Sequence, residues 1–399
     1  MYYLDGNPID AVDLKAMVIS RGVKVSREVY RAFEGKKRLS KDPLQCNTML
    51  LEDGTVVQLT DLSFHMSYIK SALSWSALQQ LKYISDLHTP FQLRLDERQN
   101  PALYDKTHKI SSVTFPEKTD FYKQKTASGL PFLGNAVLQG TEWLSFQLLW
   151  KCDFACSGNA CQYCYSGGEL ETLVQKGKAL PRYPSDEEIA EIVDYAVNCD
   201  PGIASIQITG GSTFDERAEC DRIVSILKAI DKRVGRNNIQ GEILIYTTPP
   251  KDPTLLDALF LAGADRISMS LEIWDEALAA KIMPGKMKYT GRKRHLDALE
   301  YVAKTYGKNK ACSNFIIGLE PADRMLEGAK YLAERGIVPI ASVWIPFGRP
   351  VEGSMKAPAL DYYQTVRQGL SELYCTYGLE PPGGMGLNVC MCRDIWLNR

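Results

Sequence analysis

From Leu144 onward, short apolar runs alternate with amphipathic stretches of helical length. This alternation is typical of βα units wound around a parallel sheet. Strands are expected at Ser145–Trp150, Ile203–Thr209, Glu242–Thr247, Arg266–Glu272, Asn314–Leu319 and Val338–Ile345. Because a closed barrel of such units needs eight strands, these runs predict an α/β protein with an open, partial (βα)6 TIM-like barrel.

Helices are expected between these strands. They are predicted at Ser185–Val197, Asp215–Lys232, Pro253–Ala262, Lys293–Tyr306 and Asp323–Arg335. Ser185 and Glu188 have the spacing of a capping box, in which each residue satisfies a backbone N–H of the other. Gly263, Gly307 and Gly336 follow three of the helices, where a C-cap favours a residue that tolerates positive φ.

Residues 1–140 lack this alternation and predict an additional α+β domain with a hairpin and helices. The segment Asn47–Asp61 has a hairpin pattern with its turn at Asp53-Gly54. Two helices are expected at His65–Leu73 and Ser76–Leu87. The polar region Asp96–Thr119 is expected to be a linker or a long surface connection. The partial barrel is expected over 141–350, followed by a C-terminal extension over 351–399.

The composition excludes several classes of partner. A formal net charge of −1 gives no global basic field that would attract nucleic acid. No apolar run reaches the roughly 18 residues of a membrane span, and the N-terminus MYYLDGNPID lacks the regions of a signal peptide. We therefore expect a soluble cytoplasmic protein with reduced cysteines and no membrane or nucleic-acid partner.

Four cysteines crowd into one short stretch, at Cys152, Cys156, Cys161 and Cys164. A structural zinc site usually takes two cysteine pairs about 12 to 20 residues apart. Here the two inner cysteines are much closer, which suits a loop draped over an iron-sulfur cube. A protein that binds zinc or a cluster without catalysing a reaction remains an alternative.

The cysteine stretch resembles the radical S-adenosylmethionine (SAM) superfamily, whose usual pattern is C-x3-C-x2-C with an aromatic residue before the last cysteine. Tyr163 and Cys164 match this pattern, whereas Cys156 and Cys161 are separated by four residues. The resemblance favours Cys156, Cys161 and Cys164 as ligands of a [4Fe-4S] cluster and leaves Cys152 as the doubtful fourth. It implies that SAM binds the open iron and is cleaved to methionine and a 5′-deoxyadenosyl radical.

Further segments resemble this family. Ile208-Thr209-Gly210-Gly211-Ser212 is similar to its GGE segment, which implies that Thr209, Gly210, Gly211 and Ser212 contact SAM. In the biotin-synthase-like branch an acid at the end of the fourth strand binds the SAM ribose and a later arginine binds its carboxylate. Glu272 and Arg292 match these roles, with Arg294 as the alternate, and Gly318 lies in a segment similar to the GLEP of that branch.

The other cysteines fall into two groups. The loop-like end of the chain, Gly378–Arg399, carries the pair Cys390 and Cys392, which predicts ligands for an auxiliary cluster or a cobalt cofactor, or no role. The remaining cysteines are expected in the core, at Cys46, Cys199, Cys220, Cys312 and Cys375. The four histidines show no paired spacing, so we expect no separate histidine metal site.

The resemblance implies a radical SAM enzyme that activates a C–H bond, and it leaves the reaction type open. One type is sulfur insertion or cofactor maturation. Another is cobalamin-dependent C-methylation of a protein or peptide, as in enzymes that modify methyl-coenzyme M reductase, although no D-x-H-x-x-G cobalamin motif is present. A ferredoxin or flavodoxin is the expected reducing partner, and the substrate is a peptide, a protein or a small molecule.

Overall fold

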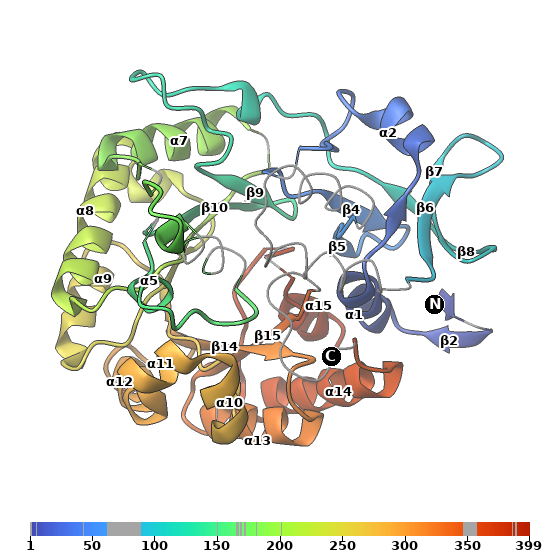
Figure 1. Cartoon of the computed structure of the whole chain (residues 1–399). Helices are drawn as coiled ribbons and strands as arrows, with labels where there is room; N and C mark the ends of the chain where they lie inside the picture. The colour runs from blue at the N-terminus through green and yellow to red at the C-terminus, as the bar shows by residue number, and fades with distance from the viewer. Residues whose placement is uncertain are drawn as a thin grey trace.

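The chain folds into a curled parallel sheet with an outer arc of helices, beside a second sheet from the N-terminal part (Figure 1). The computed structural model describes residues 2–4, 6–42, 44–61, 89–149, 151–164, 167, 170, 173–180, 182–200, 202–345, 357–384, 386–387 and 389–399. The two helices expected between His65 and Leu87 lie outside these residues.

The curled sheet is the expected partial barrel. Within the described residues it contains β9 (Val137–Gln139), β10 (Trp143–Gln147), β11 (Ser205–Thr209), β12 (Ile243–Tyr246), β13 (Arg266–Ser268), β14 (Ala311–Ile317) and β15 (Val338–Val343). The strands lie in the order β15-β14-β13-β12-β11-β10-β9. Strands β10 to β15 are parallel, and β9 pairs antiparallel with β10. The predicted fold class is confirmed.

Two short helices, α5 (Asp153–Cys156) and α11 (Pro284–Tyr289), pack against each other in the cysteine stretch and after β13. The other helices pack outside the sheet: α7 (Asp186–Cys199), α8 (Glu216–Val234), α9 (Asp257–Leu261), α10 (Glu276–Ile282), α12 (Gly291–Tyr306), α13 (Ala322–Ala333) and α14 (Leu360–Tyr377). The capping box at α7 is confirmed, because Ser185 and Glu188 each accept the other's backbone N–H. None of the helices in the described residues is long and apolar enough to cross a bilayer.

The N-terminal part is richer in strands than the sequence indicated. Its sheet has the order β3-β6-β7-β8-β4-β5, next to a β1-β2 pair. The elements are β1 (Tyr2–Leu4), β2 (Asn7–Ile9), α1 (Ala11–Arg21), β3 (Lys24–Val25), α2 (Arg27–Phe33), β4 (Thr48–Leu51), β5 (Val56–Gln58), β6 (Phe91–Leu95), β7 (Pro101–Asp105) and β8 (His108–Thr114). The expected hairpin is β4-β5. The polar stretch Asp96–Thr119 is not a linker, because it carries β7 and β8.

The C-terminal segment covers the free edge of the barrel at β15. Val343 N–H donates to the Val389 carbonyl (3.0 Å), and Met391 N–H donates to the Ala341 carbonyl (3.0 Å). Gly386 lies against Gly140, beside the opposite edge, so closely that an added Cβ would stand 2.5 Å from the Gly140 Cα. The expected loop-like end therefore bridges the open side of the sheet, and it finishes as a helix, α15 (Cys392–Leu397).

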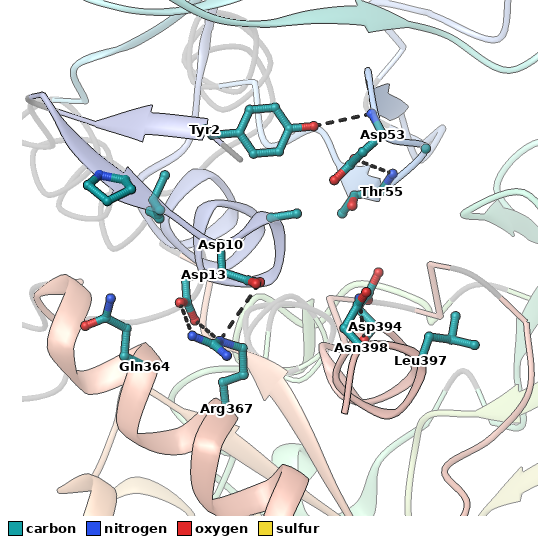
Figure 2. Close-up of a pocket in the computed structure, with 14 residues that line it drawn as sticks. Tyr2, Asp10, Asp13, Asp53, Thr55, Gln364, Arg367, Asp394, Leu397 and Asn398 are labelled. Atoms are coloured by element: carbon teal, nitrogen blue, oxygen red, sulfur yellow. Dashed lines mark hydrogen bonds and ion pairs between the residues drawn. The ribbon is translucent and has the colours of Figure 1, made fainter.

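Buried ion pairs join α1 to the C-terminal helices. Lys15 Nζ lies 2.6 Å from Asp394 Oδ2, and both side chains are almost fully buried, at 1% and 4% exposure. Figure 2 shows the neighbouring pair, in which Arg367 donates to both carboxylate oxygens of Asp13 at 2.8 Å. Burial raises the pKa of Asp13 and outweighs the opposite effect of Arg367. Because a buried charge without its partner is costly, these pairs hold the N-terminal and C-terminal segments together.

We expect Lys15→Met to destabilise the protein by about 3–5 kcal/mol, because it leaves the Asp394 carboxylate buried without a counter-charge. Urea unfolding measures this change. Lys293→Met is the matched control, because Lys293 is 87% exposed and its partner Asp297 is 54% exposed. This variant should lower the free energy of unfolding by at most about 1 kcal/mol. The double variant Lys15→Met/Asp394→Leu should recover most of the loss. Equal effects of the two single variants would contradict this role of the buried pair.

Candidate functional site

A cavity of about 230 Å³ lies where the parallel strands β10 to β13 end. It brings together most of the residues that the sequence predicted for the site. They are Cys152, Cys161, Tyr163, Cys164, Thr209, Gly210, Gly211, Ser212 and Glu272. The carboxyl ends of parallel strands are the usual place for a site in such folds, because their loops converge there.

The cysteines are arranged differently from the expected ligand set. Cys152, Cys161 and Cys164 line the cavity, whereas Cys156 does not. Cys152 is held at the mouth of the barrel because Asp153 N–H donates to the Ser212 carbonyl (2.7 Å). Burial raises the pKa of Cys161 to about 12 and also raises the pKa of Cys152. Metal binding by these thiols therefore requires them to release protons.

Three thiols of the cysteine stretch line one cavity, and thiolates are the ligands that iron-sulfur clusters take. Within the described part of the chain, no group of three His, Cys, Asp or Glu side chains is arranged to hold a single metal ion. One backbone donor already faces this set, since Gly167 N–H lies 3.3 Å from Cys164 Sγ.

The pair Gly210-Gly211 brings β11 against the start of the cysteine loop. Both residues have positive φ, at 89° and 80°. An added Cβ at Gly211 would lie 2.7 Å from Leu149 Cβ and 2.8 Å from the Lys151 carbonyl oxygen. Only glycine fits this conformation and this space. The bare backbone of the pair forms part of the cavity wall.

Glu272 and Lys286 form a charged pair on the cavity wall. Lys286 Nζ lies 3.1 Å from Glu272 Oε1 and donates to the Ser270 carbonyl (2.8 Å). Asn314 Nδ2 donates to the other oxygen of Glu272 (2.9 Å). Burial lowers the pKa of Lys286, but the charge and hydrogen bond of Glu272 together with the charges of the nearby cysteines outweigh this effect, and the pKa is raised. Lys286 is therefore a cation at neutral pH.

The sequence assigns no role to Lys286. Pro284 and Gly285 are the first residues of helix α11. Gly285 packs against the cysteine loop, where an added Cβ would stand 2.5 Å from the Asn159 carbonyl oxygen. This close approach brings Lys286 to the cavity. In the sequence, this close approach is indicated by the glycine that directly precedes Lys286.

Three other predicted residues lie outside the cavity lining. Arg292 pairs with Glu276 (3.1 Å) and stacks over Trp274. Arg294 pairs with Glu216 and donates to the Pro249 carbonyl (2.6 Å). Gly318 N–H donates to the Tyr362 hydroxyl (2.9 Å), next to Trp344 and Pro358. The structure thus does not bring these three residues together with the cysteines.

The C-terminal cysteine pair is buried behind β15 and does not line this cavity. Ala341 N–H lies 2.9 Å from Cys392 Sγ, and Cys392 N–H lies 3.2 Å from Cys390 Sγ. These contacts hold the C-terminal segment on the strand. Of the cysteines expected in the core, Cys220 and Cys312 are buried, Cys46 is half-buried, and Cys199 and Cys375 are exposed, so the expectation is wrong for the last two.

Comparison with known proteins now adds to this geometry. Residues 154–321 match the family model of the Radical SAM superfamily. This part of the chain belongs to the radical SAM superfamily. The match begins at Phe154, two residues after Cys152, and ends at Pro321, so it contains Cys156, Cys161 and Cys164, the glycine pair and the Glu272–Lys286 pair.

Individual relatives are distant. Bacteriochlorophyllide c C-7(1)-hydroxylase of Chlorobaculum limnaeum is 23% identical over 281 residues, which cover 69% of this chain and 70% of the relative. SuiB of Streptococcus suis, solved with S-adenosylmethionine, is 14% identical with a TM-score of 0.41, and the alignment covers 60% of this chain and 49% of SuiB. A radical SAM methyltransferase of Sphaerobacter thermophilus is 16% identical with a TM-score of 0.41, covering 82% and 89%. The chain thus spans about half the length of SuiB.

We expect Gly211→Ala to destabilise the protein and to abolish SAM binding, because a Cβ there collides with the backbone before Cys152. An alanine with positive φ already lowers the free energy of unfolding, and the collision should lower it by about 1–3 kcal/mol more. Gly307→Ala is the matched control, since Gly307 has φ 96° but no atom within 4 Å of the added Cβ. Urea unfolding and equilibrium dialysis with SAM measure the two effects. Similar losses of stability in both variants would refute the collision.

Proposed function

We propose that this radical SAM protein binds a [4Fe-4S] cluster on Cys152, Cys161 and Cys164 and activates a C–H bond of its substrate. The observation that carries the proposal is that these three thiols share one cavity with Gly210-Gly211 and the Glu272–Lys286 pair. Cys152 replaces Cys156 in the ligand set expected from the sequence. Cys156 then belongs to an insertion between the first and second ligands.

The residues around the cavity fit SAM. Lys286 supplies a buried positive charge for the SAM carboxylate, and Glu272 holds that ammonium in place. The backbone of Gly210-Gly211 leaves room for the amine, and the hydroxyls of Thr209 and Ser212 lie on the same wall. Burial lowers the pKa of His295 to about 3, so this cavity residue is neutral. When bound, the cluster would supply the electron that cleaves SAM to methionine and a 5′-deoxyadenosyl radical.

The reaction after C–H activation follows from fewer observations. The hydroxylase relative converts a C–H bond to C–OH, so C–H activation is the step that we carry over from it. Methylation with cobalamin remains the alternative, and Cys390 and Cys392 remain candidates for an auxiliary role. A ferredoxin or flavodoxin is the proposed electron donor. A protein that only binds a cluster or zinc is the competing class, and release of 5′-deoxyadenosine from SAM and dithionite distinguishes the two.

We expect alanine at Cys152, Cys161 or Cys164 to abolish the cluster, because each removes one of three thiolates at the cavity. Cys156→Ala is the matched control in the same loop and should retain both the cluster and SAM cleavage. Iron content, electron paramagnetic resonance of the reduced protein and 5′-deoxyadenosine are measured after anaerobic reconstitution. A cluster that survives Cys152→Ala and is lost in Cys156→Ala would restore the ligand set expected from the sequence.

We expect Lys286→Met to weaken SAM binding about 10- to 100-fold, because it removes a charged hydrogen-bond donor worth about 1.5–3 kcal/mol. Lys288→Met is the control on the same helix, since Lys288 is exposed and does not line the cavity. Lys286→Arg keeps the charge and should recover part of the affinity. Equilibrium dialysis with the cluster-loaded protein gives Kd, and unfolding curves check that each variant is folded. Unchanged affinity in folded Lys286→Met would exclude this role.

A further inference from the structure

A second cavity of about 420 Å³ adjoins the first across the mouth of the barrel. The two cavities share five lining residues: Tyr163, Thr209, Tyr246, Ser270 and Glu272. Its volume falls within the roughly 300–1,000 Å³ of small-molecule sites. A molecule in the second cavity would therefore lie next to whatever occupies the first.

Three separate parts of the chain enclose this second cavity. Cys46 and Gln58 come from the N-terminal part, before β4 and in β5, and Gln139 comes from β9 at the edge of the curled sheet. Asn314 and the strand β15 form the barrel side, and Val389 comes from the C-terminal segment that covers β15. The N-terminal part thus supplies part of the wall of the second cavity, which the strands of the half-barrel alone leave open.

The wall carries many hydrogen-bonding groups and little charge. Of the described residues that line the second cavity, Glu272 is the one acid, and none is a lysine, arginine or histidine. Glu272 is already neutralised by Lys286, which lines the first cavity and not the second. An anion in this space would be desolvated without a counter-charge, and a cation would compete with Lys286 for Glu272.

The polar side of the wall is held in a fixed arrangement. Ser342 Oγ donates to Asn314 Oδ1 (2.8 Å), and Asn314 Nδ2 donates to Glu272 Oε2 (2.9 Å). The chain of contacts continues through Glu272 to Lys286 (3.1 Å). It thus runs from the second cavity to the first. Such a network presents its groups in set orientations, which favours a ligand with matching donors and acceptors.

We infer that the second cavity is the substrate site and that it takes an uncharged molecule with amide or hydroxyl groups. The inference rests on the proposed function, because the substrate must lie beside SAM. Gln58 offers an amide to the polar groups of the substrate, and Tyr246 offers aromatic surface. The N-terminal part therefore selects the substrate, while the barrel carries out the chemistry.

A binding experiment tests the charge preference without the cluster. Trp344 lines the cavity and is only 4% exposed, so its fluorescence reports what enters. The difference between the wild-type protein and Trp344→Phe isolates its emission. Acrylamide, a neutral amide, should quench this emission with a constant about tenfold or more above that of iodide, and Gln58→Lys should reduce this ratio because it places a cation in the second cavity. Equal quenching by the two probes would overturn the inference.

A second experiment uses two matched probes with the reconstituted protein, SAM and dithionite. Perdeuterated propionamide and propionate have similar size and differ in charge. One C–D bond of the probe breaks, and the deuterium atom bonds to the 5′ carbon of the deoxyadenosyl radical. The remaining probe radical takes one electron from dithionite and one proton from water. We expect about tenfold or more deuterium in 5′-deoxyadenosine from propionamide than from propionate.

A charge change in the wall completes the test. Gln58→Lys should reduce or reverse the preference for propionamide, because it places a cation in the second cavity. Gln364→Lys is the matched control, since Gln364 lies on α14 beside a different cavity (Figure 2). Equal transfer from the two probes, or no effect of Gln58→Lys, would overturn the substrate assignment. Absence of 5′-deoxyadenosine despite a full cluster would instead refute the proposed function, and the quenching experiment would still decide the charge preference.

Discussion

The close approach of the cysteine loop to Gly211 sets the geometry of the whole site. The backbone at Leu149 and Lys151 leaves no space for a side chain there, and the Ser212 carbonyl accepts the Asp153 N–H just beyond. Cys152 is thus fixed at the strand ends before the loop begins. On its other side, the loop is held by α11, where Gly285 leaves room for Asn159. Two glycine contacts therefore position the thiols and Lys286 around one cavity.

A second constraint follows from the open form of the barrel. Six parallel strands leave an edge at β15, and an unpaired edge exposes backbone donors and acceptors. The C-terminal segment satisfies part of this edge through Val389 and Met391. The buried pair Lys15–Asp394 then ties that segment to α1. The parts of the chain before and after the barrel thus complete it together, and the second cavity lies among all three.

The sequence predicted the barrel well because its strands are buried on both faces and therefore read as apolar runs between amphipathic helices. The sequence did not predict strands β7 and β8, because a strand such as His108–Thr114 keeps polar residues on one exposed face. The sequence singled out Gly210, Gly211 and Glu272, which line the cavity, because space or charge dictates the residue type at these positions. It also singled out Cys156 and Arg292, which lie outside the lining, because sequence spacing does not show which side of a short helix faces the cavity.

Glu272 shows how the two cavities depend on one residue. Its φ of 66° is unusual for a residue with a long side chain, and such strain costs roughly 1–3 kcal/mol unless the surroundings impose it. Here the surroundings do, because Glu272 N–H donates to the Asn314 carbonyl (2.8 Å) and the Glu272 carbonyl accepts from Ile316 (2.9 Å). A glycine would adopt this backbone without strain. That the position carries a carboxylate instead indicates that its charge is needed, to hold Lys286 on one side and Asn314 on the other.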